Sequence, residues 1–221
     1  QMGQNGTNER TETSGGSAAN TIAGFASFGG KGGFIGKVAE DDLGTTYQNE
    51  MRALGAEFTT QPLAMGAKTG RCLILVTPDG QRTMNTFLGA TQFLPAEALN
   101  EEAIGGAGIL YLEGYLWDPE EPRRAMRSAI KTAKDAGRKV AFTLSDAFVI
   151  ERYGDDFRAL IDGGMIDILF ANEVELGALT GETDFDAGVD ALKDKVPTLV
   201  VTRSEKGAVC VTGGETYKVA A

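Results

Sequence analysis

The sequence predicts an α/β protein with a mostly parallel sheet and a small β flap. From about residue 95 onward, short apolar runs alternate with segments of helical periodicity. Strands that alternate with helices form parallel sheets covered by helices on both faces. The apolar share of 42% in 221 residues is sufficient for one large core. The segment 71–87 instead has strand-like runs on either side of Pro-Asp-Gly, which is typical of a hairpin.

Residues 14–56 predict the order helix, strand, helix. Apolar residues have helical spacing over 17–28, and the pattern stops at two glycines, which favour a helix end. The short apolar run 33–38 predicts a buried strand. Asp41 can cap a helix from residue 42 to 54, which Gly55 ends.

The remaining chain predicts regular strand and helix units. In the longest predicted helix, proline and glutamates come early and basic residues late, which suits the helix dipole. The expected strands are 107–112, 139–144, 166–170, 198–202 and 208–212. The expected helices are 119–136, 149–161, 173–180 and 185–193.

Composition excludes several classes of function. The sequence has no histidine, which rules out Ser-His-Asp and Cys-His catalysis and histidine-ligated zinc. A general base in this sequence would therefore be Asp, Glu, Lys or Tyr. A net charge of -10 argues against a nucleic-acid partner.

Other features predict a cytoplasmic protein with no membrane partner. Cys72 and Cys210 form no Cys-x-x-Cys pair, so we expect reduced thiols. No apolar run approaches the about 18 residues that cross a bilayer, and the polar start lacks a signal-peptide core. Because residue 1 is not Met, we expect a piece of a longer reading frame.

Two groups of glycines lie at the ends of predicted elements. Gly15 and Gly16 lie just before the first helix and leave their amides accessible to a ligand, and Asn20 follows one turn later. On spacing alone, a glycine turn with a capping serine is slightly favoured as the explanation of this pattern. The second series, Gly29 to Gly36, ends a helix and opens a strand, which is the reverse of a dinucleotide-binding fingerprint. A nicotinamide-dependent oxidoreductase is therefore disfavoured.

Three further motifs follow predicted strands, where ligand sites of α/β sheets lie. Asn172 and Glu175 share the first turn of a helix and suit a hydrated Mg²⁺, or equally a capping box. Glu113 and Tyr115 suit a polyol or ring, or an ordinary strand end. The loop 202–207 suits a nucleotide contact, although a tight turn with exposed charges is favoured.

The order of these motifs resembles the phosphofructokinase-B (ribokinase) family of carbohydrate kinases, and within it the adenosine kinase-like sugar and nucleoside kinases. The similarity runs from about residue 12 to the end. It is carried by Gly-Gly-Ser-Ala-Ala-Asn, Phe-Ile-Gly-Lys-Val-Ala-Glu-Asp-Asp-Leu-Gly, Thr-Gly-Arg-Cys, Leu-Glu-Gly-Tyr, Asn-Glu-Val-Glu and Thr-Arg-Ser-Glu-Lys-Gly.

The resemblance implies a ribokinase-like three-layer α/β/α sandwich with a mostly parallel central sheet and a small β lid. The kinase core would be 14–56 and 91–221, and the lid region 1–13 and 57–90. The implied activity is ATP-dependent phosphorylation of a hydroxymethyl group on a sugar or nucleoside, with Mg²⁺. The implied acceptor residues are Gly15, Gly16, Asn20, Glu113 and Tyr115. The implied nucleotide residues are Asn172, Glu175 (to Mg²⁺ through water), Thr202, Ser204 and Gly207.

The sequence departs from the family in three places. The signature Asp-Thr-x-Gly-Ala-Gly-Asp, which carries the catalytic base, does not occur in it, and neither does the usual first strand. At Ser204 the family usually has glycine. In relatives the signature follows shortly after the region where this chain stops, so we expect the base beyond Ala221 and assign no catalytic residue.

We therefore expect a chain truncated at both ends, and we expect these 221 residues to be inactive. The alternative is a non-catalytic sugar- or nucleoside-binding paralogue or scaffold. The acceptor stays open, and the lid suggests a homodimer.

Overall fold

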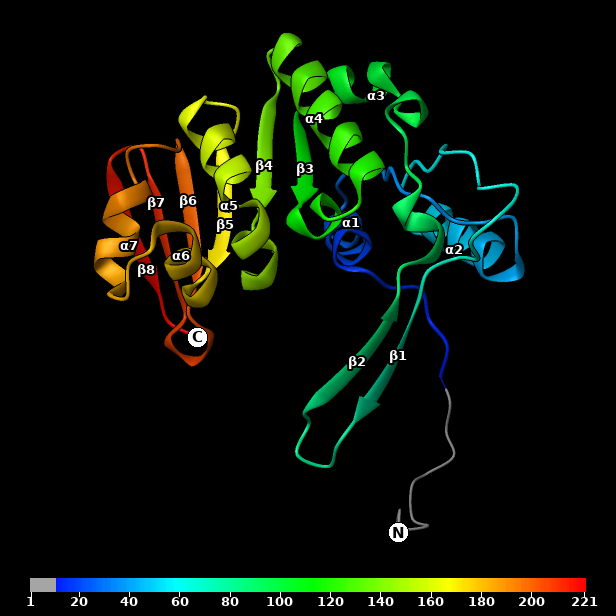
Figure 1. Ribbon diagram of the computed structural model, residues 1–221, viewed down its shortest axis with the longest axis horizontal. Helices are drawn as coiled ribbons and strands as arrows, with labels where there is room; N and C mark the ends of the chain where they lie inside the picture. Colours follow the sequence, from blue (N-terminus) through cyan, green and yellow to red (C-terminus); the bar gives the residue numbers. More distant parts are fainter. Residues whose placement is uncertain (1–10) are drawn as a thin grey trace.

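A six-stranded sheet forms the centre of the structure, a computed structural model that describes residues 11–221 (Figure 1). Its strands lie side by side in chain order. They are β3 (Ile109–Glu113), β4 (Lys139–Thr143), β5 (Ile168–Asn172), β6 (Thr198–Thr202), β7 (Ala208–Thr212) and β8 (Glu215–Val219). The first four are parallel, and β7 and β8 pair antiparallel. The mostly parallel sheet is confirmed, and β8 is a strand that the sequence analysis did not predict.

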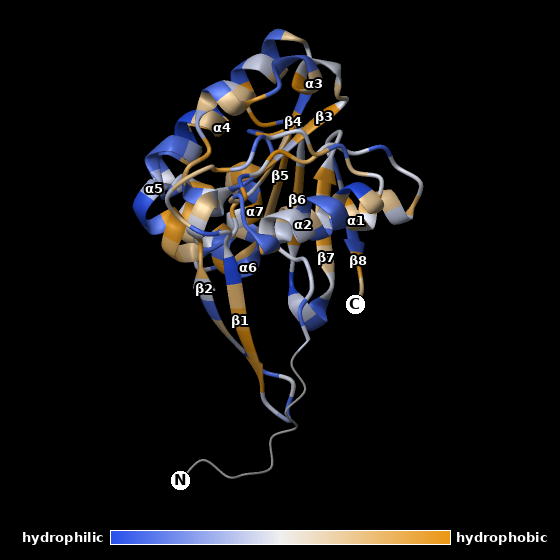
Figure 2. Cartoon of the chain, turned by 90° about the vertical axis from the view of Figure 1, so that its right-hand side faces the viewer, coloured by the Kyte–Doolittle hydropathy of each residue, from blue (hydrophilic) through white to orange (hydrophobic). Residues whose placement is uncertain are grey.

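Four helices cover one face of this sheet (Figure 1). They are α4 (Glu120–Asp135), α5 (Ala147–Asp162), α6 (Glu173–Thr180) and α7 (Phe185–Leu192). Alternate strand residues such as Phe142, Leu169 and Leu199 point to these helices and are fully buried. Figure 2 shows mostly hydrophobic strands beside helices with mixed faces. The large core is therefore the layer between the sheet and α4–α7.

The opposite face of the sheet contacts α1 (Ser17–Ser27) beside β3. Farther along this face, Phe170, Val200 and Cys210 lie opposite one another in register and are half-buried. The helix α1 therefore lies beside β3 on the opposite face from α4–α7.

The N-terminal part has a small core of its own around α2 (Asp42–Ala53). The rings of Phe34, Tyr47 and Phe58 pack edge-on or tilted, with centroids 5.2 to 6.1 Å apart. The predicted strand over 33–38 is wrong, because within this segment only Gly33 forms a bridge, to Glu57, and Ala39, one residue past the segment, forms another, to Leu63. Among residues 11–221 the segment has no neighbouring strand with which to build a ladder.

The predicted hairpin consists of β1 (Arg71–Val76) and β2 (Arg82–Phe87), which pair antiparallel and project from the body (Figure 1). All twelve strand residues are exposed. At the base of the hairpin, the two backbone segments at Gly70 and Gly89 pass close to each other. A Cβ on Gly89 would lie 2.2 Å from the Lys68 carbonyl oxygen. The division into core and lid stays a prediction, and residues 1–10 of the predicted lid lie outside the described part.

Short elements complete the structure. The helix α3 (Glu101–Gly106) packs on α4. In the described part of the chain, four 3-10 turns occur, at Gly89–Gln92, Ala96–Ala98, Gly114–Trp117 and Ser204–Lys206. Within residues 11–221, none of the helices has the length and apolar character needed to cross a bilayer.

Candidate functional site

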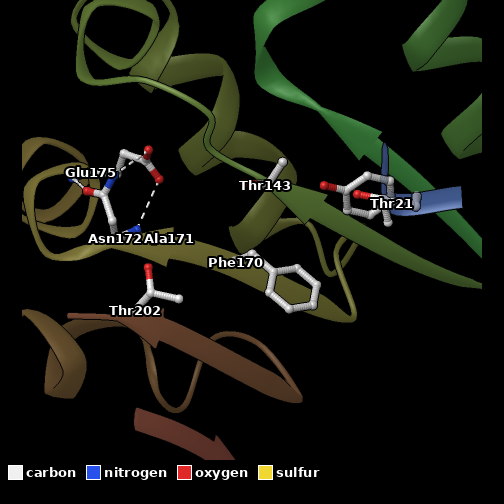
Figure 3. A pocket seen from close by; sticks show the side chains of 8 residues that line it. Thr21, Thr143, Phe170, Ala171, Asn172, Glu175 and Thr202 are labelled. Atoms are coloured by element: carbon white, nitrogen blue, oxygen red, sulfur yellow. Dashed lines mark hydrogen bonds between the residues drawn. The ribbon is translucent and has the colours of Figure 1, made fainter. Parts of the chain in front are cut away.

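A cavity of about 390 Å³ lies at the C-terminal ends of the parallel strands, on the face that α1 contacts (Figure 3). Two helices, α1 and α6, and the four parallel strands contribute residues to it. They are Thr21, Tyr111, Thr143, Phe170, Ala171, Asn172, Glu175 and Thr202. The cavity therefore joins α1 to the segment that carries the Asn-x-x-Glu motif, at the edge where α/β sheets place their ligands.

Asn172 and Glu175 form a complete capping box at the start of α6. The Glu175 amide donates to the Asn172 side-chain oxygen at 2.8 Å, and the Asn172 amide donates to the Glu175 carboxylate at 3.1 Å. The Asn172 side-chain amide adds a 2.8 Å bond to the second carboxylate oxygen. The capping alternative of the sequence analysis is thus present, and the same two side chains line the cavity.

The Glu175 carboxylate is buried, with 7% of the residue exposed. Burial raises its pKa, the charge of Asp146 raises it further, and the Asn172 bond opposes both. Within the described residues no group of three or more His, Cys, Asp or Glu side chains can hold a metal directly. Both Glu175 oxygens already accept from Asn172, and a contact of Glu175 with Mg²⁺ through water stays a prediction.

Thr202 ends β6 directly beside Asn172 in the parallel register, and it lines the same cavity. The turn after it is held by Arg203, whose Nε donates to Glu173 and whose guanidinium lies 3.7 Å from the centroid of the Phe185 ring. This clamp joins the β6–β7 turn to the first turn of α6 and to α7. It therefore fixes the two segments that carry the predicted nucleotide residues.

Ser204 and Gly207 lie in that turn and do not line the cavity. Ser204 has φ +48°, in the left-handed region that favours glycine, which the family usually has here. Gly207 has φ +86°, and a Cβ there would lie 1.9 Å from the Val219 carbonyl oxygen. The positive φ and the close contact with Val219 therefore require glycine at position 207, whether or not a nucleotide contacts this turn.

Gly15, Gly16 and Asn20 lie at the start of α1, outside the cavity lining. A Cβ on Gly15 would meet nothing within 4 Å, so open space lies beside the loop. Gly16 is the N-cap with φ 105°, and its carbonyl accepts from the Asn20 amide at 2.8 Å. The Asn20 residue is exposed and its side chain is available to a ligand.

Glu113 lies at the end of β3 and turns toward α1. Its carboxylate accepts from Ser17 Oγ, and from the Tyr111 hydroxyl at 3.2 Å. Burial raises the pKa of Glu113, and these bonds oppose the shift. Burial together with the Glu113 charge raises the pKa of Tyr111 to about 12.

Tyr115 lies in the 3-10 turn after β3 and is 44% exposed. Its pKa is raised first by burial and then by the charges of Asp146, Glu175 and Glu113. The charges of three carboxylates therefore raise the pKa of this one hydroxyl, at the C-terminal edge of the sheet.

Ala221 is the residue beyond which the sequence analysis expects the catalytic base. It is exposed, follows the end of β8 at Val219, and is not among the residues that line the cavity. Neither Ala221 nor its neighbour Ala220 has a side chain that could take up a proton. The structure therefore assigns no base to this end of the chain, and a base beyond Ala221 stays a prediction.

Sequence reasoning did not select Thr21, Tyr111, Thr143, Phe170 or Ala171 as site residues. Two local signals were present for the first pair. Thr21 lies four residues after Ser17 on one helix, and Tyr111 lies two residues before Glu113 on one strand, so each pair shares a face. Thr143 and Phe170 join them through the strand register, which the sequence does not encode locally.

Comparison with known proteins finds relatives that are named as kinases. The adenosine kinase of Sinorhizobium meliloti superposes with a TM-score of 0.91 at 44% identity, over 96% of this chain and 64% of that one. The ATP-dependent ribose-1-phosphate kinase of Halopiger xanaduensis is 28% identical over 82% of this chain and 60% of its own length. The guanosine-inosine kinase of Escherichia coli K12 is 35% identical over 62% of this chain and 32% of its own length.

The chain thus spans less than two thirds of the length of these relatives. The close superposition confirms the ribokinase-like α/β fold and the adenosine kinase-like character of the sequence. Residues 4–221 match the family described as pfkB family carbohydrate kinase. Because that match covers nearly the whole chain, the protein belongs to the pfkB family of carbohydrate kinases.

Proposed function

We propose that the protein, in its full-length form, transfers the γ-phosphoryl group of ATP to a hydroxymethyl group of a sugar or nucleoside. The observation that carries this proposal is the shared cavity, in which Asn172, Glu175 and Thr202 meet Thr21 of α1. Relatives named for adenosine, guanosine-inosine and ribose-1-phosphate support a small hydroxyl acceptor. One of them is named as ATP-dependent.

The acceptor residues are Gly15, Gly16, Asn20, Glu113 and Tyr115. Open space beside Gly15 leaves room for a ligand close to the backbone, and the exposed Asn20 amide can pair with vicinal hydroxyls. The acidic edge around Tyr115 can accept hydrogen bonds from the hydroxyl groups of a sugar or nucleoside.

The nucleotide residues are Asn172, Glu175, Thr202, Ser204 and Gly207, with Mg²⁺ held by Glu175 through water. A bound Mg²⁺ neutralises charge on the phosphates as the phosphoryl group moves. The capping box holds Asn172 and Glu175 in fixed orientation, and Thr202 presents its hydroxyl beside them. These residues orient the phosphates and do not supply the base.

We propose that the 221-residue chain alone is inactive, because the aspartate that the resemblance assigns as base is expected beyond Ala221. The test compares this chain with the protein extended at both ends to the length of its relatives. ADP release is followed with adenosine, guanosine, inosine, fructose and ribose. We expect acceptor-dependent turnover from the extended protein only.

Two outcomes would contradict these proposals. Phosphoryl transfer by the 221-residue chain would show that the base lies within it. No turnover by the extended protein, combined with acceptor binding in calorimetry, would favour the non-catalytic binding protein instead. We place the protein in the cytoplasm, as its two free cysteines suggest, and cell fractionation tests this.

The lid also suggests a homodimer. Leu73 and Leu75 face one side of the hairpin and Ile74 and Val76 the other, and all four are exposed. A lid closing over the acceptor covers only one side, and its free strand edges can pair with a second copy. We expect a dimer in light scattering that Leu75→Asp or Val76→Asp converts to monomer. A monomeric wild-type protein would exclude it.

A further inference from the structure

Two of the sequence motifs that resemble the kinase family lie outside the cavity at the strand ends. One contains Asp41 and leads into α2, and the other contains Thr69 and leads into β1 of the hairpin. The structure brings these two motifs into direct contact, although 28 residues separate Asp41 from Thr69. The contact lies at the root of the hairpin, where the chain leaves the body of the protein.

The Asp41 carboxylate makes this contact with three hydrogen bonds. The Thr69 amide donates to one carboxylate oxygen at 3.0 Å. The other oxygen accepts from the Thr69 hydroxyl and, at 2.9 Å, from the Gly44 amide of α2. The Thr69 hydroxyl accepts in turn from the Ala39 amide at 2.9 Å, and Thr69 is only 5% exposed. One carboxylate therefore caps α2 and holds the hairpin root.

This carboxylate is charged at neutral pH. Burial acts to raise the pKa of Asp41, but the bonds from Thr69 and Gly44 and the charge of Lys68 outweigh it, and the pKa is lowered. Hydrogen bonds to an ionised acceptor are stronger than bonds between neutral groups. A Cβ on Gly44 would lie 2.9 Å from the Thr69 hydroxyl oxygen, so the first turn of α2 packs directly on the root.

The second strand of the hairpin is held at the same root. The Ala90 amide donates to the Lys68 carbonyl at 2.8 Å. A Cβ on Gly70 would lie 2.6 Å from the Leu88 carbonyl oxygen, so the two backbone segments are close. All residues of β1 and β2 are exposed, and packing along the strands therefore does little to orient them. The root sets the direction in which the hairpin projects from the body (Figure 1).

The helix α2 also contacts the proposed acceptor loop. The Ser14 amide donates to the Glu50 carboxylate at 3.3 Å. A Cβ on Gly16 would lie 4.0 Å from the Tyr47 hydroxyl oxygen, so the loop passes close to this side chain. The Tyr47 ring packs in the small N-terminal core, which holds the helix in place. One helix therefore links the acceptor loop to the root of the hairpin.

We propose that Asp41 is a positioning residue, whose bonds to Thr69 fix the hairpin in one orientation relative to the acceptor loop. The inference rests on the proposed function, because that loop is the proposed acceptor site and the hairpin is the predicted lid. If only a fraction of the molecules holds the hairpin in this orientation, the apparent affinity for the acceptor falls by that fraction. Loss of one hydrogen bond to a charged group lowers such a fraction about tenfold.

The kinetic test uses Thr69→Val and Thr69→Ser in the extended protein, with Thr60→Val as control. Valine keeps the shape of threonine without the hydroxyl, whereas serine keeps the hydroxyl. Thr60 is buried to a similar degree, with 7% exposed. We expect Thr69→Val to raise the acceptor KM about tenfold, while the KM for ATP stays within about twofold. Thr69→Ser and Thr60→Val should keep the acceptor KM of the wild type.

Asp41→Asn separates the contact with Thr69 from the helix cap. Asparagine caps a helix as well as aspartate does, but it has one acceptor oxygen and no charge, so it cannot keep all the bonds at the root. We expect a raised acceptor KM with α2 intact. A general loss of stability would instead lower the active fraction, and with it kcat, and would leave both KM values unchanged.

The orientation test uses two spin labels on the 221-residue chain. One label is on Cys72 of β1 and the other on α5 through Glu151→Cys, in a Cys210→Ser background; Cys72 and Glu151 are exposed. We expect Thr69→Val and Asp41→Asn to broaden the distribution of label distances, measured by pulsed electron resonance. An unchanged distribution, or an acceptor KM that Thr69→Val leaves unchanged, would overturn the inference. If Thr69→Val fails to fold, Asp41→Asn alone decides.

The two readouts separate the inference from the proposed function. An extended protein without turnover contradicts the kinase proposal, while a broader distance distribution in Thr69→Val still supports the contact at the root. Normal turnover with an acceptor KM and a distance distribution that Thr69→Val leaves unchanged contradicts the inference and leaves the kinase proposal intact.

Discussion

Replacing Gly207 by alanine tests whether the turn after β6 is set by the backbone. The new Cβ would lie 1.9 Å from the Val219 carbonyl oxygen and 2.9 Å from two Ala220 backbone atoms. Val219 pairs with Ala208 at the end of β8, so this end of the strand must shift. An L-residue at φ +86° adds about 1–2 kcal/mol. Forced overpacking adds about 1–3 kcal/mol, so we expect a loss of about 2–5 kcal/mol.

Gly214→Ala is a matched control in the turn at the opposite end of β7. Gly214 has φ +79°, close to that of Gly207, but a Cβ there meets nothing within 4 Å. Urea unfolding of both variants, followed by circular dichroism, gives the two losses in unfolding free energy. Their difference measures the clash alone. A difference below about 0.5 kcal/mol would refute the reasoning, since overpacking costs more than that.

Three further predictions concern stability. Ser204→Gly relieves the left-handed conformation and should raise the unfolding free energy by up to about 1 kcal/mol, after the entropy of glycine is subtracted; a loss in urea unfolding contradicts this. Asn172→Ala removes the capping box and should cost about 1–2 kcal/mol in the same assay; no loss would mean that the cap contributes nothing. Burial acts to raise the pKa of Asp156, but bonds from Trp117 and Arg127 outweigh it, and the pKa is lowered in the fold. A lowered pKa stabilises the fold above the unfolded value of about 3.9 and loses that contribution as the pH falls below it. Acid unfolding followed by Trp117 fluorescence should therefore show a steeper loss for wild type than for Asp156→Asn, and parallel curves contradict the assignment.

Local patterns predicted the regular elements well. The helix expected over 119–136 occurs as Glu120–Asp135, because periodicity, early acids and late bases all agree there. The segment 33–38 has the composition of a buried strand but no partner strand, and strand formation depends on the partner. The strand β8 was missed although Gly213-Gly214 and the alternation after it are typical of a hairpin.

The site was predictable in part. The spacing of Asn172 and Glu175 predicted both the capping box and the placement of the two side chains on one face of α6. Residues three apart are separated by almost one helical turn. The contact between Ser17 and Glu113 spans 96 residues, and no local pattern in the sequence encodes it. Only the meeting of α1 with β3 in three dimensions shows that these two motifs share one network.

The order of the strands has a consequence for how the chain folds during synthesis. Each strand from β4 to β8 pairs with the strand made immediately before it. Contacts of low sequence separation form quickly, and domains begin to fold while the ribosome is still adding residues. The sheet can therefore grow one strand at a time in the direction of translation. At every stage, the most recently made strand is the edge strand with which the next strand pairs.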